Sequence, residues 1–140
     1  MIKQIAQSKG REIQDFCRRH NLDLLILFGS SASGTTHLRS DVDLAVQPAF
    51  GTQLSKLHLI EELGIILDGY QIDLTVISTD TDPLLLFEIF SDGSVLYERT
   101  IGLFENRRLK AWHLYLDTRP LRELEKSFNE NRIREFRHVT

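Results

Sequence analysis

Three aspartates are the residues of this chain whose type and spacing best support chemistry. Asp41 and Asp43 lie in the stretch Ser40–Leu44, and Asp73 lies in the largely apolar stretch 71–77. Strands disfavour aspartate, because its short charged side chain packs poorly on a pleated surface and prefers local turn bonding. Three carboxylates on two strand-like segments therefore need a counter-charge, and the usual one is a divalent cation bound by oxygen ligands.

The alternation of side chains along a strand predicts where these carboxylates point. In each segment the aspartates share one face, and apolar side chains occupy the other: Val42, Leu44 and Val46 in the first, Ile72, Leu74 and Val76 in the second. If the two strands are neighbours, all three carboxylates meet on the uncovered side of the sheet. Such a cluster suits one or two Mg²⁺ ions. The alternative is a solvated turn at 41–43 and a surface charge at Asp73.

A segment of small residues precedes the acids. Residues 24–28 are apolar throughout and predict a buried strand, which ends at Gly29 and Ser30. Small residues let backbone N–H groups approach an anion, and a helical turn over 31–35 would direct its N-terminal dipole at a phosphate. The Ser30 hydroxyl could donate one more hydrogen bond. A Gly-Ser turn by itself is usually only a loop, so its weight comes from its position shortly before the paired acids.

These segments together resemble a known family pattern. Residues 29–34, followed by residues 40–44, are similar to the pattern Gly-Ser-x-x-x-Gly…Ser-Asp-x-Asp-Leu of nucleotidyltransferases in the DNA polymerase beta-like superfamily. The short length and the segments 72–74 and 87–98 narrow the resemblance to the minimal nucleotidyltransferases (MNT), the antitoxins paired with HEPN-domain toxins. The resemblance covers about residues 24–98. It departs from the pattern at Ser33, where many members carry arginine.

The resemblance implies both a fold and an activity. The implied fold is α/β, the nucleotidyltransferase fold, with a small mixed β-sheet flanked by helices and a C-terminal helical extension. The implied reaction moves AMP from ATP to a tyrosine hydroxyl of a cognate HEPN ribonuclease toxin. Asp41 and Asp43 would hold the Mg²⁺ that grips the triphosphate, and Asp73 would complete a second metal position and help to deprotonate the hydroxyl. Gly29 and Ser30 would bind phosphate oxygens.

Two other functions stay open. The first is a small-molecule adenylyltransferase, a class that usually carries a larger second domain, for which the 42 residues after position 98 leave little room. The second is a non-catalytic antitoxin that neutralises its toxin by binding alone. Ser33 favours this second alternative, whereas the intact set of acids argues against it, because clustered carboxylates are costly to keep.

The composition is that of a small globular protein. The chain has 140 residues, 41% of them hydrophobic and 26% charged, which gives room for one core with a modest annex. The single cysteine, Cys17, excludes an internal disulfide framework and a cysteine-rich zinc site, and we expect it to be a buried thiol. We see no targeting segment and no stretch of transmembrane length, so we expect a cytoplasmic protein without membrane contact.

Charge is unevenly distributed along the chain. Residues 1–98 hold 7 basic and 14 acidic residues, whereas residues 99–140 hold 10 basic and 6 acidic ones. The acidic part fits a metal site and argues against direct nucleic-acid binding there. The basic part could contact an acidic partner, RNA or the acidic part of its own chain, and a solvated helix face explains it equally well.

The resemblance implies a nucleotidyltransferase domain over 1–98, and hydrophobic spacing predicts a helical extension over 99–140. We expect helices over 1–20, 52–67 and 83–92, and strands over 24–28, 42–47, 70–77 and 94–97. Thr52 would cap the second helix, whose inner stripe would be Leu54, Leu57, Ile60, Leu63 and Leu67. Two further apolar stripes flank Pro120: Leu109, Trp112 and Leu116 before it, and Leu121, Leu124 and Phe128 after it. We expect these stripes to pack on the core of the chain itself. The alternative is a binding face for a toxin or a second copy.

Overall fold

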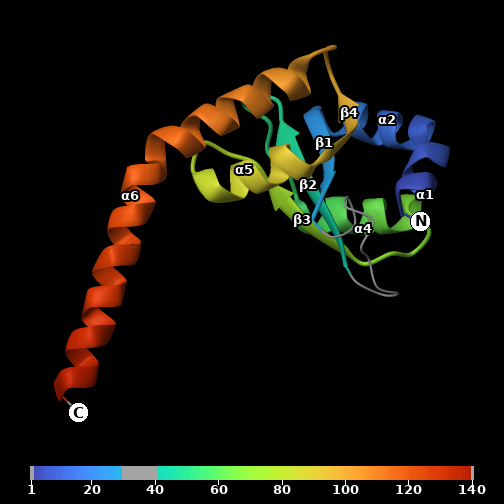
Figure 1. Cartoon of the computed structure of the whole chain (residues 1–140). Helices are drawn as coiled ribbons and strands as arrows, with labels where there is room; N and C mark the ends of the chain where they lie inside the picture. The colour runs from blue at the N-terminus through green and yellow to red at the C-terminus, as the bar shows by residue number, and fades with distance from the viewer. Residues whose placement is uncertain (1, 30–40, 140) are drawn as a thin grey trace.

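The structure is a computed structural model that describes residues 2–29 and 41–139 (Figure 1). In chain order its elements are α1 (Ile2–Ser8), α2 (Gly10–Arg19), β1 (Leu22–Phe28), β2 (Val42–Pro48), α4 (Lys56–Ile66), β3 (Ile72–Val76), α5 (Pro83–Asp92), β4 (Ser94–Glu98) and α6 (Leu103–Val139). The predicted α/β class and the four predicted strands are therefore confirmed. The expected single helix over 1–20 is divided in two at Lys9, immediately before the helix-weakening Gly10.

The four strands form one mixed sheet in the order β3-β2-β1-β4. β1 is antiparallel to both β2 and β4, and β2 is parallel to β3. A parallel pair needs a crossover connection, which α4 supplies between β2 and β3. β1 is a central strand, and its side chains from Leu24 to Leu27 are fully buried on both faces, which explains its unbroken apolar sequence.

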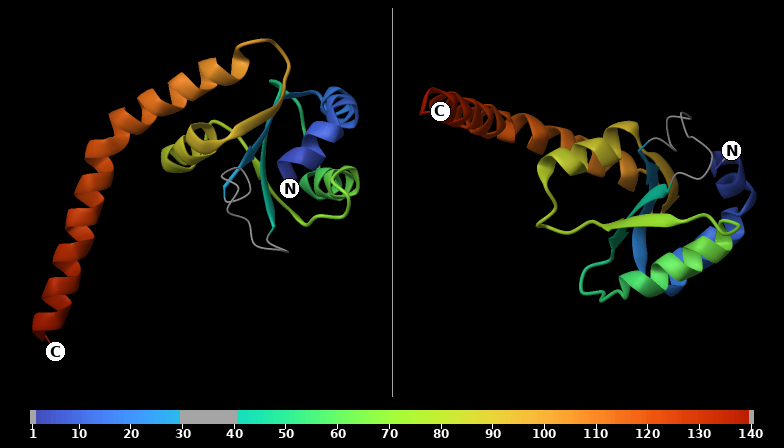
Figure 2. Two further views of the ribbon diagram at one scale, coloured as in Figure 1. Left: turned by 45° about the vertical axis from the view of Figure 1, so that its right-hand side comes forward. Right: turned by 90° about the horizontal axis from the view of Figure 1, so that it is seen from below.

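Helices cover both faces of the sheet, and each face has its own hydrophobic cluster (Figure 2). On one face, α1, α2 and α4 pack on a cluster that includes Val42, Leu44 and Val46, as the alternation of β2 predicts. Cys17 is buried in this cluster, and burial raises the pKa of its thiol to about 12, so the prediction of a structural thiol is confirmed. On the other face, α5 and the first part of α6 pack on Leu24, Ile26 and Ala45.

The face that carries the aspartates differs from the expectation of an uncovered side. Ile89, Phe90 and Phe104 cover its middle, because β1 presents apolar side chains to this face as well. Only the end of the sheet where β2 and β3 begin carries the acids, and there Asp43 is half-buried. The carboxylates therefore lie at the edge of a covered face.

Local signals located one helix start and missed another. Asp82 caps α5 as predicted: the backbone N–H of Leu84 donates to Asp82 Oδ1 at 2.7 Å, and Pro83 occupies the first turn. The predicted start of α4 at Thr52 is wrong, since α4 begins at Lys56 and Thr52 Oγ1 instead accepts a hydrogen bond from Asn21 at 2.8 Å. Four of the five predicted inner residues pack on the core, namely Leu54, Ile60, Leu63 and Leu67, whereas Leu57 is 67% exposed and Leu59 is buried instead.

The C-terminal extension is one long helix with Pro120 inside it. Its first part contacts the body through Phe104 and Ala111, and the ring of Tyr115 stacks on Phe87 with 4.1 Å between centroids. In the turn before Pro120, the Thr118 hydroxyl donates to the carbonyl of Leu114 at 2.8 Å. The second half of α6 leaves the body of the molecule (Figure 1). Among the helices that the structure describes, none is long and apolar enough to cross a bilayer.

The expectation that both apolar stripes of α6 pack on the chain's own core is wrong. All six side chains are at least 44% exposed: Leu109, Trp112, Leu116, Leu121, Leu124 and Phe128. A different face of the same helix, marked by Phe104 and Ala111, meets α5. Spacing identified the apolar faces of the helix correctly but could not say which of them faces the core.

Candidate active site

The candidate site begins where β1 ends, at Gly29. Gly29 has a φ of +74°, a conformation that L side chains rarely adopt. A Cβ built at this position would lie 3.1 Å from Asp43 Cγ and nearer still to Asp43 Oδ2, so a side chain here would displace the Asp43 carboxylate. The glycine therefore has two functions: it allows the turn after β1, and it leaves room for the Asp43 carboxylate beside the backbone.

Asp43 lies opposite Phe28 of β1 on one side and beside Asp73 of β3 on the other. Because β2 and β3 are parallel and these two aspartates are partners in the register, their side chains point to the same face of the sheet. Asp43 is half-buried and Asp73 is exposed. The two strands thus bring together carboxylates that are 30 positions apart in the sequence, as the alternation predicted.

The electrostatics of the site reflect this proximity. Burial raises the pKa of the Asp43 carboxyl, and the negative charge of Asp73, a hydrogen bond shared with the Asp73 side chain and the charge of Asp41 raise it further. A positive charge beside the two carboxylates, whether a proton or a metal cation, is therefore stabilised by them.

The donor set fits a hard divalent cation. Asp43 and Asp73 form a pair of oxygen ligands, and Asp41 acts on that pair through its charge. Within residues 2–29 and 41–139, however, no three His, Cys, Asp or Glu side chains are close enough together to hold one ion. The structure thus contains a pair with a third acid nearby, where the sequence suggested three converging carboxylates. Ser30, the other expected phosphate-binding residue, lies outside the described residues.

A second polar cluster was missed by sequence reasoning. Glu62 of α4 accepts a hydrogen bond at 2.8 Å from His20, and it lies 3.3 Å from His58 and 3.5 Å from Arg19. Burial alone would raise the pKa of Glu62, but the hydrogen bond from His20 and the charges of these three groups outweigh burial and lower it. The spacing of His58 and Glu62, four apart on a helix, was the signal for this cluster. It joins α2 to α4 on the face opposite the aspartates.

Comparison with known proteins identifies the family of the chain. The sequence profile of the family described as "Polymerase beta, Nucleotidyltransferase" matches residues 11–101, from α2 to just beyond β4. The match spans more than half of the chain and includes Gly29, Asp41, Asp43 and Asp73. The chain therefore belongs to this nucleotidyltransferase family. A search of curated protein sequences found no significant match.

Solved structures with the same fold come from toxin–antitoxin complexes. A chain of the crystal structure described as "the toxin-antitoxin with AMP-PNP" is 25% identical with a TM-score of 0.70, over 86% of this chain and 98% of that one. A chain of a mutant MntA-HpeT toxin–antitoxin is 25% identical with a TM-score of 0.68, over 86% and 96%. A chain of the tri-AMPylated Shewanella oneidensis HEPN toxin with MNT antitoxin is 22% identical with a TM-score of 0.66, over 89% and 98%. The resemblance to MNT antitoxin structures, and with it the nucleotidyltransferase fold, is confirmed.

Proposed function

We propose that this chain is a Mg²⁺-dependent nucleotidyltransferase and an antitoxin, which transfers AMP from ATP to a tyrosine hydroxyl of a cognate HEPN ribonuclease toxin. The observation that carries this proposal is the pairing of Asp43 with Asp73 next to Gly29, in a chain of the nucleotidyltransferase family. The similarity to a toxin–antitoxin structure that contains AMP-PNP supports an adenine nucleotide as the donor.

Each residue of the site has a role in this proposal. Gly29 and Ser30 bind phosphate oxygens, because a turn of small residues exposes backbone N–H groups to an anion. Asp41, Asp43 and Asp73 are the residues that would hold Mg²⁺. When bound, the metal neutralises triphosphate charge and increases the acidity of the attacking hydroxyl. The carboxylate pair is favourable for this purpose, because a cation offsets both the burial of the Asp43 charge and its repulsion with Asp73, which together raise the pKa of Asp43.

The reaction is a displacement at the α-phosphorus of ATP. The acceptor oxygen forms a bond to that phosphorus, and the bond from the phosphorus to the departing pyrophosphate breaks. The acceptor's proton passes to Asp73, which is exposed at the edge of the sheet and can release it to solvent. Alignment of the two substrates and neutralisation of charge supply most of the rate enhancement in such a reaction.

The C-terminal extension is the part of the chain best suited to hold the toxin. In this proposal residues 1–98 form the nucleotidyltransferase domain, and residues 99–140 form a helical extension that reaches a partner. The exposed stripe Leu121, Leu124 and Phe128 supports this division, because these side chains contact no core of their own. After β4, the described residues from 103 to 139 form α6.

The test uses the purified protein, ATP, Mg²⁺ and a candidate HEPN-type toxin, to be sought as a reading frame beside this gene. Intact mass spectrometry of the HEPN protein should show added AMP with the native chain and none with Asp73→Asn. Substitution of the acceptor tyrosine by phenylalanine should abolish the addition. An unchanged mass, with the HEPN ribonuclease active as before, would contradict the proposal.

One observation favours the alternative of a non-catalytic antitoxin. Among the described residues, Asp41 does not join Asp43 and Asp73 in a three-ligand group. The same experiment separates the two functions: a binding antitoxin silences the ribonuclease without changing its mass, and Asp73→Asn silences it equally well. A catalytic antitoxin loses its effect in that variant when the toxin is in excess.

A further inference from the structure

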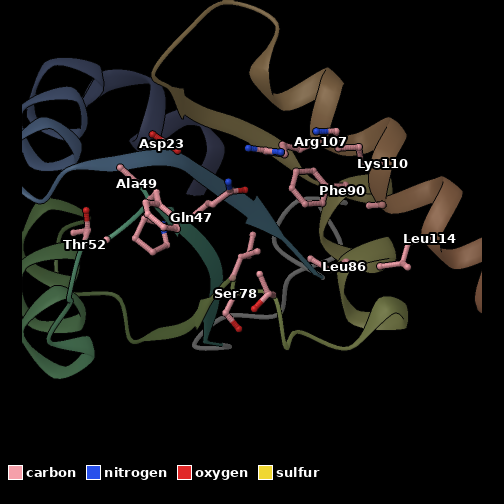
Figure 3. Close-up of a pocket in the computed structure, with 16 residues that line it drawn as sticks. Asp23, Gln47, Ala49, Thr52, Ser78, Leu86, Phe90, Arg107, Lys110 and Leu114 are labelled. Atoms are coloured by element: carbon pink, nitrogen blue, oxygen red, sulfur yellow. The ribbon is translucent and has the colours of Figure 1, made fainter.

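A pocket of about 590 Å³ lies between the sheet, α5 and α6 (Figure 3). It is on the same face of the sheet as the aspartates but at the other end of β2 and β3, where Gln47 and Ser78 line it. Gln47 follows Asp43 by four residues, which along a strand corresponds to about 13 Å. None of the three aspartates lines this pocket, so it is separate from the candidate active site.

One wall of the pocket is basic. Arg107 and Lys110 lie one turn apart on α6 and both border the cavity (Figure 3). Arg107 Nε is buried and has no hydrogen-bond partner in the described part of the chain. Asp23 also lines the pocket, but it is already paired with Arg99, whose Nε lies 3.2 Å from Asp23 Oδ1. The cavity therefore offers positive charge, although residues 1–98 are strongly acidic as a whole.

The other walls combine apolar surface with neutral polar groups. Leu86 and Phe90 of α5 and Ile77 at the end of β3 form an apolar floor. The turn after β2 places Phe50 on the rim with its side chain fully exposed, at 106% of its reference area. A hydrogen bond of 3.0 Å from the N–H of Thr52 to the carbonyl of Ala49 closes this turn. An aromatic ring held in solvent beside a cationic cavity is a surface that a flat ring can stack on.

We propose that this pocket binds an organic phosphate that carries a flat ring, of the class of the nucleoside monophosphates. Two adjacent cations match a dianionic phosphate better than a monoanionic carboxylate, and the guanidinium of Arg107 supplies the unused buried donor. The ring lies on the apolar floor and against Phe50, and Gln47 and Ser78 bond to its polar edge. The volume is in the range of small-molecule sites. This inference does not depend on the proposed transfer reaction, since it concerns different residues.

The test probes the protein with AMP in the presence of EDTA, which removes Mg²⁺ from the experiment. We expect AMP to shift the backbone amide NMR signals of Phe50 and Ser78 and to leave those of Asp43 and Asp73 unchanged. Adenosine lacks the phosphate and inorganic phosphate lacks the ring, so each should bind at least about tenfold more weakly by calorimetry. Shifts confined to the aspartate end, or equal binding of adenosine and AMP, would overturn the proposal.

Variants locate the phosphate. Lys110→Gln and Arg107→Gln should each weaken AMP binding about tenfold, since each removes a charge-assisted hydrogen bond. Arg108→Gln is the matched control, because Arg108 is on the same helix, does not line this pocket and pairs with Glu105. Lys110 is exposed, so its variant keeps the test valid even if Arg107→Gln fails to fold. AMP binding that is unchanged in Lys110→Gln, or equally reduced in Arg108→Gln, would refute the assignment.

Discussion

The Asp43 side chain occupies the space that a side chain at Gly29 would need: a Cβ on Gly29 would lie 3.3 Å from Asp43 Cβ and closer still to the Asp43 carboxylate. The position of the Asp43 carboxylate on β2 therefore depends on the glycine that follows β1. The small residue after the first strand therefore leaves the space in which the Asp43 carboxylate lies.

We expect Gly29→Ala to reduce both stability and transfer. The positive φ and the collision with Asp43 together should cost about 1–3 kcal/mol, measured by urea unfolding. Gly69→Ala is the matched control, because Gly69 has a φ of +85° but open space around its Cβ position. Both variants should lose stability through the backbone, whereas only Gly29→Ala should lose most of its transfer activity. Equal activity in the two variants would contradict a role of Gly29 in placing Asp43.

Asp43→Asn should abolish transfer and yet stabilise the metal-free protein. Replacement of the carboxylate by an amide removes the cost of burying its charge and the repulsion with Asp73, a gain of less than about 1 kcal/mol at pH 7 in EDTA. Mg²⁺ should raise the melting temperature of the native chain but not that of the variant. Asp80→Asn, which removes an exposed acid after β3, should change neither property. Full transfer activity in Asp43→Asn would remove this residue from the mechanism.

The stabilisation by Asp43→Asn should depend on pH with a defined sign. The pKa of Asp43 is raised in the folded state, so the native side chain favours folding most below its unfolded pKa, near 3.8, and loses that contribution as the pH rises. The melting temperature of the variant minus that of the native chain, in EDTA, should therefore grow from pH 3.5 to pH 7. A difference that shrinks over this range would contradict the electrostatic origin.

Glu62→Gln should have the opposite pH dependence. The pKa of Glu62 is lowered in the folded state, so its contribution is present above its unfolded pKa of 4.5 and is lost as the pH falls through the folded value. At pH 7 we expect a loss of about 1 kcal/mol in urea unfolding, because His20 then lacks its charged acceptor. Glu61→Gln, the exposed neighbour, should cost little. Equal effects of the two variants would show that the cluster adds no stability.

Substitution of Leu121, Leu124 and Phe128 by serine should separate folding from partner binding. These side chains are more than 60% exposed, so the melting temperature should change little. Binding of the HEPN-type protein, measured by calorimetry, should weaken at least about tenfold if this stripe forms the contact. Serine in place of the exposed Leu57 and Ile65 on α4 is the control and should leave binding unchanged. Unaltered binding in the triple variant would place the contact elsewhere.

The acids and their strands could be predicted because both depend on local rules. A period of two places Asp43 and Asp73 on the face opposite Leu44 and Leu74, and a parallel crossover through α4 then makes them neighbours. The cap at Asp82 needs only its own residue and the following proline. Such features are encoded within a few positions of the sequence.

What the sequence did not show depends on distant contacts. The apolar cover over the middle of the aspartate face comes from Phe90 and Phe104, which reach β1 only in the folded chain. Helix α4 begins at Lys56 and not at the predicted Thr52, whose hydroxyl accepts a hydrogen bond from Asn21, 31 positions earlier in the sequence. In α6, several faces are apolar, and only the packing of Phe104 and Ala111 on the body decides which one is inside.

The outward course of α6 sets a geometric condition on any acceptor. A helix of 37 residues has a contour of roughly 55 Å, and its outer half runs away from the body of the molecule (Figure 1). A protein bound to this outer half would lie well away from the pair of Asp43 and Asp73. A rigid surface on that protein would not by itself bring an acceptor hydroxyl to the pair. The tyrosine proposed as the acceptor should then lie on a loop or tail long enough to span that distance, or belong to a neighbouring subunit of a larger assembly.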